Sequence, residues 1–572
     1  MIVQLKDVTF TYLHFGRPAI HDVNLELEPG SISALVGAVG SGKTTLLLTL
    51  DGLIPEAVPG VLEGSIIVDG TDVRKVQAVQ MAEHMGLVFD DPSLQIVGLT
   101  VEEDMAFGPA NLGLTALQIQ ERVAEGLQKV HLIGLNKRSP RKMSGGQQQL
   151  LAVGGVLAMH PRFVAMDEPV AMLDPVGKAE VLHSVQEMRD KLGLTVLISE
   201  SGTDIESVCE FADKIWLMHK GKVVGSGRAG QVFADRALIE ELKVKAPQVT
   251  RLAWEMGLKL PDGRVPTTTA EAYELVAPTL VGKRVTASLP AESQPSLGDP
   301  VVKVSGCCHT YPASPPVQAL CGIELTIRRG EMVAILGQNG SGKTTLAYHL
   351  VGVLRPTNPD AVIEVDGVNV VKAPLEETIQ HINYVFQNPA NQLFCETFDA
   401  EVRYGPERLG LPKDEVDKRV LEALSAVGLE KLLKEDTVGI SRAGEAMLSL
   451  ASVLSMRPQI LIVDEPTGGL DWESGNKVMQ ILADLNRQGR TIIIITHDME
   501  LAARYCGRLV VMKDGLVMMD GTPREVFSQP DKLRGARLYP PQITQLAQRL
   551  ASFGMPADVL TVEEFLSLLP AT

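Results

Sequence analysis

GAVGSGKTTLL (residues 37–47) and GQNGSGKTTLA (residues 337–347) are two copies of one glycine-rich stretch in a chain of 572 residues. Each copy follows a β-branched run typical of a strand and precedes an apolar run typical of a helix. At such a junction the pattern G-x-x-x-x-G-K-[ST] binds phosphate, because its backbone N–H groups wrap the phosphates, Lys reaches the β/γ oxygens and Ser/Thr holds Mg²⁺. The candidate nucleotide-binding residues are Gly37, Gly40, Ser41, Gly42, Lys43, Thr44 and Thr45, and again Gly337, Gly340, Ser341, Gly342, Lys343, Thr344 and Thr345. Since two matches in register are not a chance glycine turn, we predict two sites for ATP with Mg²⁺.

A second repeated motif indicates that a whole domain is duplicated. VAMDEP (residues 164–169) and LIVDEP (residues 461–466) recur at almost the same spacing as the glycine-rich stretches. Short β-branched runs such as SISALVGAV (residues 31–39) alternate with longer helical patterns, which is typical of β/α units around a buried, largely parallel sheet. We therefore predict two tandem α/β domains.

Further patterns suggest how each half is organised. Both halves end in an amphipathic helical pattern, APQVTRLAWEMG (residues 246–257) and PPQITQLAQRLASFG (residues 540–554), each followed by a short second helix. Thr100 and Glu103 form a capping-box pattern that opens a helix-rich insert running to about residue 142. We predict a first large domain at 1–245, a helical appendix at 246–277, a Pro-rich linker without apolar periodicity at 278–299, a second large domain at 300–535 and a second appendix at 536–572.

Charge and hydropathy exclude several functional classes. With 70 acidic and 53 basic residues, the formal charge of −17 would repel a phosphate backbone, so nucleic acid is not an expected partner. No run approaches the 18 apolar residues of a membrane helix, and the alternation in MIVQLKDVTFTY (residues 1–12) predicts a strand rather than a signal peptide. The six cysteines include no C-x-x-C pair. We therefore expect a cytosolic chain with reduced, mostly buried thiols.

The repeated Asp-Glu pair follows an apolar strand in both halves. Asp167 and Asp464 each end such a strand, where a carboxylate can hold Mg²⁺ through its waters. Glu168 and Glu465 come next and are suited to orient an attacking water, so both are candidate catalytic bases. An exposed acidic pair would be a credible explanation for one copy, but it is a weak explanation for two copies that both follow phosphate loops.

The segment MSGGQQQ (residues 143–149) resembles the signature of ATP-binding-cassette (ABC) ATPases, and the resemblance covers nearly the entire chain. It implies that Ser144, Gly145, Gly146 and Gln147 bind nucleotide, that Tyr12 and Tyr311 stack on adenine, and that Leu173 and Leu470 begin D-loops. VFQNPANQ, from Val385, resembles the Q-loop of the family. The resemblance thus implies Mg²⁺ ligands at Thr44, Asp167, Thr344, Gln387 and Asp464, and catalytic residues at Glu168, Gln387, Glu465 and His497.

FDDPSLQIVGLTVEEDMAFGPANLGL (residues 89–114) is similar to the ATPase subunits of energy-coupling factor (ECF) transporters for vitamins and metal ions. The tail PPQITQLA also resembles that group. The resemblance implies that this chain is two such ATPases fused together, lying on the cytoplasmic face of a prokaryotic membrane. Its partners would be a membrane T-type subunit, docked on the helical inserts, and a substrate-binding S-type membrane subunit. The transported substrate stays open.

The resemblance also implies that the halves face head to tail, so each ATP lies between the phosphate loop of one half and the signature of the other. On this arrangement the Lys343 site combines Gln387, Asp464, Glu465 and His497 with the intact signature of the first half. The Lys43 site instead has Asp90 in place of Gln387, Glu200 in place of His497, and Arg442 and Ala443 in place of two signature glycines. We predict that the Lys343 site hydrolyses ATP and that the Lys43 site binds it with slow or no turnover.

Two other functions compete with transport. A soluble tandem ABC ATPase acting on ribosomes or DNA would share the duplication, but it would be expected to carry a long charged linker, basic surfaces, heptads or zinc cysteines. A regulatory module that senses nucleotide without turnover is the other alternative. The complete set of catalytic residues predicted for the Lys343 site argues against that alternative.

Overall fold

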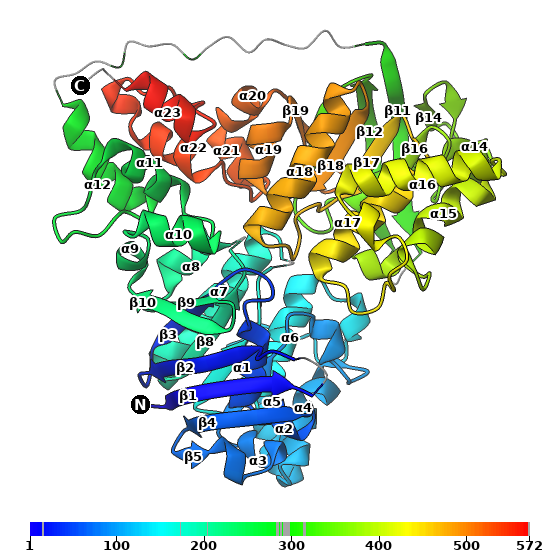
Figure 1. Ribbon diagram of the computed structural model, residues 1–572. Coiled ribbons are helices and arrows are strands. Elements are labelled where there is room, and N and C mark those ends of the chain that lie inside the picture. Colours follow the sequence, from blue (N-terminus) through cyan, green and yellow to red (C-terminus); the bar gives the residue numbers. More distant parts are fainter. Residues whose placement is uncertain are drawn as a thin grey trace. The chain divides into compact units, whose positions relative to one another are not determined.

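The computed structural model describes residues 1–13, 16–171, 173–202, 204–281, 285, 289, 298–312 and 316–569. The chain forms two compact units, Met1–Val276 and Ala277–Thr572 (Figure 1). Each unit contains one glycine-rich loop and two β-sheets. The boundaries predicted inside the units, at residues 245 and 535, remain predictions.

The first unit is built on a mostly parallel central sheet with the strand order β10-β9-β3-β8-β7-β6, in which only β10 runs antiparallel to its neighbour. All residues of β3 are buried, as expected for a strand covered on both faces. The α/β fold class is thus confirmed. The strands of this sheet are β3 (Ile32–Val36), β6 (Met85–Val88), β7 (Phe163–Met166), β8 (Thr195–Glu200), β9 (Lys214–His219) and β10 (Lys222–Gly227).

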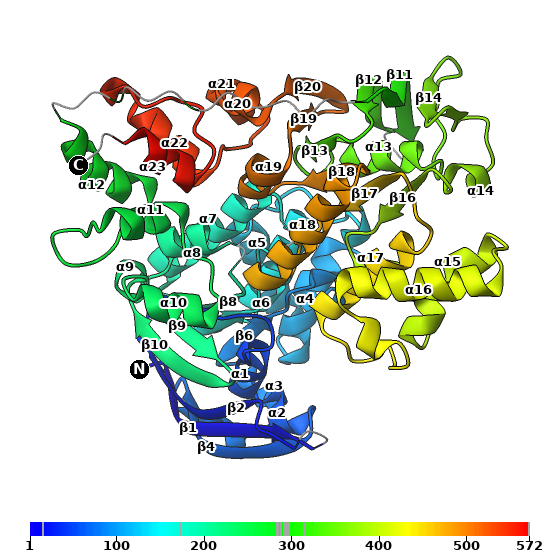
Figure 2. The same ribbon diagram turned by 45° about the horizontal axis from the view of Figure 1, so that its top comes forward.

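A second, antiparallel sheet in the same unit was not predicted. It comprises β1 (Val3–Tyr12), β2 (Ile20–Leu27), β4 (Gly60–Val68) and β5 (Thr71–Asp72), seen in Figure 2 beside α1 and α3. Leu5, Val8 and Phe10 are buried, so the predicted alternation of β1 is confirmed. The spacing of three between Leu5 and Val8 coincides with a shift in strand register, which keeps both side chains on the buried face.

The second unit repeats both sheets. Its central sheet has the order β16-β17-β18-β13-β19-β20, and its antiparallel sheet has the order β12-β11-β14-β15. The strands are β11 (Pro300–Tyr311), β12 (Val317–Arg328), β13 (Met332–Leu336), β14 (Val362–Val365), β15 (Val368–Asn369), β16 (Ile382–Val385), β17 (Ile460–Asp464), β18 (Thr491–Thr496), β19 (Arg508–Lys513) and β20 (Leu516–Gly521).

The helices also occur in matching order in the two units. In the first they are α1 (Lys43–Leu50), α2 (Leu53–Glu56), α3 (Ala78–Met81), α4 (Val101–Asn111), α5 (Ala116–Lys129), α6 (Gly145–Leu157), α7 (Pro175–Leu192), α8 (Ile205–Phe211), α9 (Ala229–Val232), α10 (Arg236–Leu242), α11 (Gln248–Met256) and α12 (Thr269–Leu280), the last of which continues past the division. In the second they are α13 (Lys343–Leu350), α14 (Leu375–Thr378), α15 (Phe398–Arg408), α16 (Lys413–Val427), α17 (Arg442–Leu454), α18 (Trp472–Arg487), α19 (Met499–Tyr505), α20 (Pro523–Phe527), α21 (Pro530–Gly535), α22 (Gln542–Arg549) and α23 (Val562–Leu568).

A helical subdomain follows the edge strand of each central sheet. The predicted capping box is present, because Thr100 accepts from the backbone N–H of Glu103 while the Glu103 side chain accepts from Thr100. The subdomain extends beyond residue 142, since α6 packs on α4 and α5, and its Leu151 is fully buried in a hydrophobic core shared with residues of both helices. Figure 2 shows the equivalent α15, α16 and α17 in yellow.

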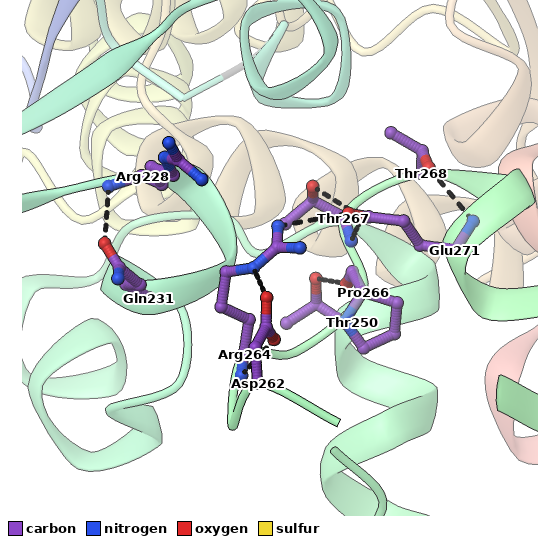
Figure 3. Close-up of polar contacts among 9 residues, drawn as sticks. All are labelled: Arg228, Gln231, Thr250, Asp262, Arg264, Pro266, Thr267, Thr268 and Glu271. Atoms are coloured by element: carbon purple, nitrogen blue, oxygen red, sulfur yellow. Dashed lines mark hydrogen bonds and ion pairs between the residues drawn. The ribbon is translucent and has the colours of Figure 1, made fainter. Parts of the chain in front are cut away.

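In the helical appendix of each unit, a threonine on the first helix donates a hydrogen bond to a backbone carbonyl that precedes the second helix. Thr250 in α11 donates to the carbonyl of Pro266 at 2.6 Å (Figure 3), and Thr544 in α22 donates to the carbonyl of Val559 at 2.5 Å. In the first appendix the guanidinium of Arg264 also contacts Glu271 at 3.2 Å. The corresponding partner of Glu564 in the second unit is Arg524, at 2.6 Å.

The structure differs from the prediction at the start of the linker, because residues 278–280 belong to α12, with Pro278 inside the helix. Most of the remaining predicted linker lies outside the described residues. In the part of the chain that the structure describes, no helix has both the length and the apolar character needed to cross a membrane. The six cysteines are unpaired, and Cys209, Cys307 and Cys506 are buried.

Candidate active sites

Both phosphate loops connect the end of a central strand to the first residue of a helix. The first runs from β3 into α1 and the second from β13 into α13. Gly42 and Gly342 cap these helices at φ of 104° and 101°, and a side chain at either position would meet a backbone carbonyl, of Ala19 or of Ala319 respectively. These glycines let the loop close tightly, so that the first N–H groups of the helix are available to an anion.

Side-chain groups in the loops also fit a triphosphate. The hydroxyls of Ser41 and Ser341 are buried and have no hydrogen-bond partner among the described residues. Lys43 donates to the carbonyls of Gly37 at 2.8 Å and Ala38 at 3.2 Å, which holds its ammonium group inside the loop. Lys343 is held in the same way, at 2.7 Å from the carbonyl of Gly337 and 2.9 Å from that of Gln338. Both loops therefore offer a cation and free donors to an anionic ligand.

The two tyrosines with a predicted role in adenine stacking lie beside these loops. The Tyr12 hydroxyl is 2.9 Å from that of Thr45, and the Tyr311 hydroxyl is 3.2 Å from that of Thr345. Each tyrosine thus joins the antiparallel sheet to the helix that begins in the phosphate loop. The contact places the rings near the loops, while stacking on adenine stays a prediction.

In the second unit, Asp464 is the last residue of β17 and faces the phosphate loop. Its Oδ2 accepts from the Thr344 hydroxyl at 3.0 Å and from the Tyr384 hydroxyl at 2.5 Å. Burial raises the pKa of Asp464 to about 6. A carboxylate beside a threonine hydroxyl is an oxygen donor set of the kind that Mg²⁺ prefers, so the predicted metal ligands Thr344 and Asp464 fit together. Gln387 lines the same small cavity as Asp464 and Glu465.

The neighbouring Glu465 is held by two side chains, one from the last residue of β18 and one from the residue that follows it. Its Oε1 lies 2.8 Å from His497 Nδ1, and its Oε2 accepts from the Thr496 hydroxyl at 3.1 Å. Burial alone would raise the pKa of Glu465, but His497, Lys343 and Thr496 outweigh it and hold the pKa below the ordinary value. Glu465 is therefore an oriented carboxylate able to accept a proton.

The first unit contains the same acidic pair with different partners. Asp167 accepts a short hydrogen bond from the Ser199 hydroxyl, and the same hydroxyl accepts from the backbone N–H of Glu168 at 3.0 Å. Glu168 lies 3.5 Å from Lys43 and accepts from Ser201. Burial raises the pKa of Glu168, and the neighbouring Asp167 adds to this effect. Glu168 is thus held by a lysine and a serine, whereas Glu465 is oriented by an imidazole and a hydroxyl.

Glu200 occupies the position that His497 has in the second unit, but its side chain turns into its own loop. Its Oε1 accepts from the backbone N–H groups of Gly202 at 2.8 Å and Asp204 at 3.1 Å. Only 1% of Glu200 is exposed. Burial, together with the charges of Asp204 and Glu168, raises the pKa of Glu200 to about 7. Glu200 therefore closes a turn rather than supporting Glu168.

The other departures from the predicted catalytic set are Asp90, Arg442 and Ala443, and Arg442 lines the same small cavity of its own unit as Gln387 and Asp464. Its contribution to the Lys43 site stays a prediction. Asp90 follows β6 and accepts from the backbone N–H of Asp91 at 2.9 Å, whereas Gln387 follows β16 at the catalytic cavity. Ser144 and Gln147 form a capping box at the start of α6, whereas Ser441 caps α17 by accepting from the backbone N–H of Gly444, without the reciprocal side-chain bond. The two caps occupy equivalent positions in the ungapped alignment that matches Gly145 and Gly146 with Arg442 and Ala443.

The structure thus brings together the predicted residues of each half. Lys343, Thr344, Gln387, Asp464, Glu465 and His497 gather in the second unit, and Lys43, Asp167, Glu168 and Glu200 gather in the first. The pairing of the Ser144–Gln147 segment with Lys343 stays a prediction. Sequence reasoning missed Tyr384, Thr496, Ser199 and Ser201. A residue-by-residue comparison of the repeats would have singled out Tyr384, because Leu87 stands at its position in the first half.

Comparison with known proteins agrees with these motifs. A family model described as "ABC transporter" matches residues 20–171 and 320–468. A protein of Caldanaerobacter subterraneus subsp. tengcongensis, provisionally named an ABC transporter ATP-binding protein, is 37% identical over 98% of both chains. A protein with the same provisional name from Methanosarcina acetivorans is 36% identical over 100% of this chain and 94% of its own length.

Among solved structures, the chain is similar to CbiO1 of Clostridium perfringens, which is described as part of the ABC transporter complex CbiONQ. The two are 37% identical, with a TM-score of 0.38. The match covers 43% of this chain and 98% of CbiO1.

Proposed function

The chain belongs to the ABC transporter family of ATPases, and we propose that it powers a membrane importer of the energy-coupling factor type that takes up a vitamin or a metal ion. Its two domains are ATPase domains, and ATP is the ligand that they bind. In the proposal the chain lies on the cytoplasmic face of a prokaryotic membrane. A T-type and an S-type membrane subunit are its partners.

Hydrolysis is assigned to the second unit. The Lys343 loop binds the phosphates, and Glu465, held by His497 and Thr496, accepts a proton from the attacking water. Bound Mg²⁺, held by Thr344, Asp464 and Gln387, would neutralise charge on the phosphates. The first unit binds ATP and turns it over slowly or not at all, because Glu200 is turned into its own loop and Glu168 has no imidazole partner among the described residues.

The observation that carries the transport assignment is a group of exposed apolar side chains beside the catalytic loops. Leu94, Val97, Leu99 and Phe107 are 76%, 58%, 80% and 55% exposed, and all lie in the segment between β6 and the end of α4. In the second unit, Phe394 and Tyr404 are exposed at the equivalent place, with ring centroids 4.8 Å apart. Contiguous exposed apolar surface marks protein or membrane contacts, and we propose that these side chains form such a surface. We refer to them as the docking residues.

This proposal is tested by purification from membranes of the source organism. A tagged chain should co-extract with polytopic membrane proteins, including a small substrate-binding one, and Leu99→Glu should abolish the association while leaving the ATPase activity of the isolated chain intact. Leu192→Glu is the matched control, because Leu192 is also exposed, at 48%, but lies at the end of α7. Co-sedimentation with ribosomes or DNA, or full association of Leu99→Glu, would refute the transport assignment.

A further inference from the structure

An aromatic cluster in the second unit contacts the Asp464 carboxylate through Tyr384. Tyr384, in β16, is 9% exposed and packs edge-on against Phe386 and Tyr348, with ring centroids 4.9 and 5.4 Å away. Tyr348 belongs to α13, the helix that begins in the phosphate loop. The ring of Tyr384 is therefore fixed on both sides, and its hydroxyl has a defined position.

That hydroxyl donates to Oδ2 of Asp464 at 2.5 Å. The strands β16 and β17 are parallel neighbours, with Val385 paired to Val463, so the tyrosine reaches across to the residue that ends the adjacent strand. The same oxygen accepts from Thr344 at 3.0 Å. Hydrogen bonds from a hydroxyl to a carboxylate are among the stronger ones in proteins. Two donors on one oxygen thus hold the carboxylate in one orientation toward the phosphate loop.

The first unit lacks this support. The positions of Tyr348 and Tyr384 are occupied by Leu48 and Leu87, which have no hydroxyl, while Phe89 matches Phe386. Asp167 takes its hydrogen bond from Ser199 in β8, on the opposite side of β7. The two units therefore hold the same aspartate from different neighbouring strands.

We propose that Tyr384 is a positioning residue that orients Asp464 for the divalent metal of the second ATP site. The inference rests on the proposed assignment of Asp464 as a ligand of Mg²⁺. A second hydrogen-bonding partner fixes the geometry of a metal ligand, and its loss typically lowers metal affinity or activity about 10- to 100-fold. Because the first unit has leucine at this position, the second site should bind the metal–nucleotide complex more tightly than the first site does.

The test uses Mn²⁺ as a spectroscopic probe, titrated by electron paramagnetic resonance in the presence of a non-hydrolysable ATP analogue. The full chain carries Lys43→Ala in every arm, so that the signal comes from the second site. We expect Tyr384→Phe to raise the dissociation constant for Mn²⁺ about 10-fold or more. The Mg²⁺ concentration required for half-maximal ATPase activity should rise in parallel, and saturating Mg²⁺ should restore much of the turnover.

Tyr384→Leu provides a second variant, since leucine is the residue that the first unit packs at this position. Tyr539→Phe, in the same unit but 54% exposed, is the matched control and should keep the parental affinity for Mn²⁺. Parental affinity in either Tyr384 variant would overturn the inference. If the parental chain itself bound no Mn²⁺ with the analogue, the assignment of the second ATP site would be wrong instead.

Discussion

Glu168 and Glu465 hold the same position in the two repeats, yet their surroundings give them different chemistry. Glu465 is oriented by an imidazole and a hydroxyl, and its pKa is held below the ordinary value. Glu168 contacts Lys43, and burial raises its pKa. A general base must lie within hydrogen-bond reach of the proton that it abstracts, so its orientation matters. An imidazole and a hydroxyl orient Glu465, whereas Glu168 is held by a lysine and a serine.

The first prediction compares these two glutamates. Glu465→Gln should lower the ATPase rate about 100-fold or more, because a positioned base contributes roughly 10²- to 10⁴-fold. Glu168→Gln should keep most of the parental rate. Steady-state phosphate release at saturating ATP measures both effects. Equal losses from the two substitutions would refute unequal sites.

Glu200 supports a prediction of pH dependence. A carboxyl whose pKa rises to about 7 on folding, from an ordinary value of 4.5, binds its proton more tightly in the folded state. Its stabilising effect is therefore complete below pH 4.5 and is lost as the pH rises to 7, at about 1.4 kcal/mol for each unit of pKa shift. Glu200→Gln, which mimics the protonated side chain, should make the first unit more stable than the parent at pH 8.

Calorimetric melting of both proteins between pH 5 and pH 8 measures this difference. The gap between the variant and the parent should widen in favour of Glu200→Gln as the pH rises. Asp51, whose pKa burial also raises to about 7, is present in both proteins and cancels in the comparison. A gap that stays constant with pH would show that Glu200 does not titrate in this range.

At the scale of elements, the two units build the same arginine–glutamate contact from different positions. Arg524 belongs to α20 in the large domain of the second unit, whereas Arg264 comes from the appendix itself in the first. In the first unit, Gly230 of α9 occupies the position that Arg524 has in the second unit. A side chain at Gly230 would lie 2.5 Å from the Val265 carbonyl and 3.1 Å from Cβ of Arg264. The glycine thus leaves space for the segment that carries Arg264. Figure 3 shows the contacts of Arg264 with Asp262 and of Thr267 with Glu271 in this segment.

We therefore predict that Gly230→Ala destabilises the first unit by about 1–3 kcal/mol, because backbone must move to admit the methyl group. Gly225→Ala, in β10, is the control, since the nearest atoms to its methyl group would be the side chains of Leu217 and Leu238, both at 3.7 Å. Chemical unfolding followed through Trp254, on α11 of the same appendix, reports the change. The prediction fails if the two substitutions have equal effects.

For the whole molecule, the decisive expectation is that each ATP is shared between the halves. Gly145→Arg introduces into the first half the residue found at Arg442 in the second. Among the described residues of its own unit, a Cβ added at Gly145 would have only Leu173 within 4 Å, at 3.8 Å, so we expect the fold to tolerate the substitution. We expect turnover at the Lys343 site to fall about as far as in Glu465→Gln, because the arginine would enter the site across the pair.

Arg442→Gly is the reciprocal variant, and it should leave the ATPase rate within about twofold of the parent. Melting temperatures of both variants show whether folding is intact. If Gly145→Arg hydrolyses ATP at the parental rate, the signature of the first half does not serve the Lys343 site, and the shared arrangement is wrong.

Much of the site was predictable, because its motifs are local in sequence. The phosphate loops, the Asp-Glu pairs and the caps at Thr100 and Ser144 each depend on a few consecutive residues, so their spacing alone indicates their geometry. The antiparallel sheets and the extension of the helical subdomain through α6 were not predicted. Both depend on pairing or packing between segments distant in sequence, which no local pattern records.

The amino-acid sequence by itself determined the duplication, the α/β class, the two phosphate loops and the substitutions that make the halves unequal. Only the tertiary structure decided which hydroxyl holds each aspartate, that Glu200 turns into its own loop, and that Arg264 replaces Arg524. The physical reason is that a motif states which groups are present, whereas their partners are chosen by side chains on neighbouring strands. Tyr384 and Asp464 are 80 residues apart in the chain and meet only because β16 lies beside β17.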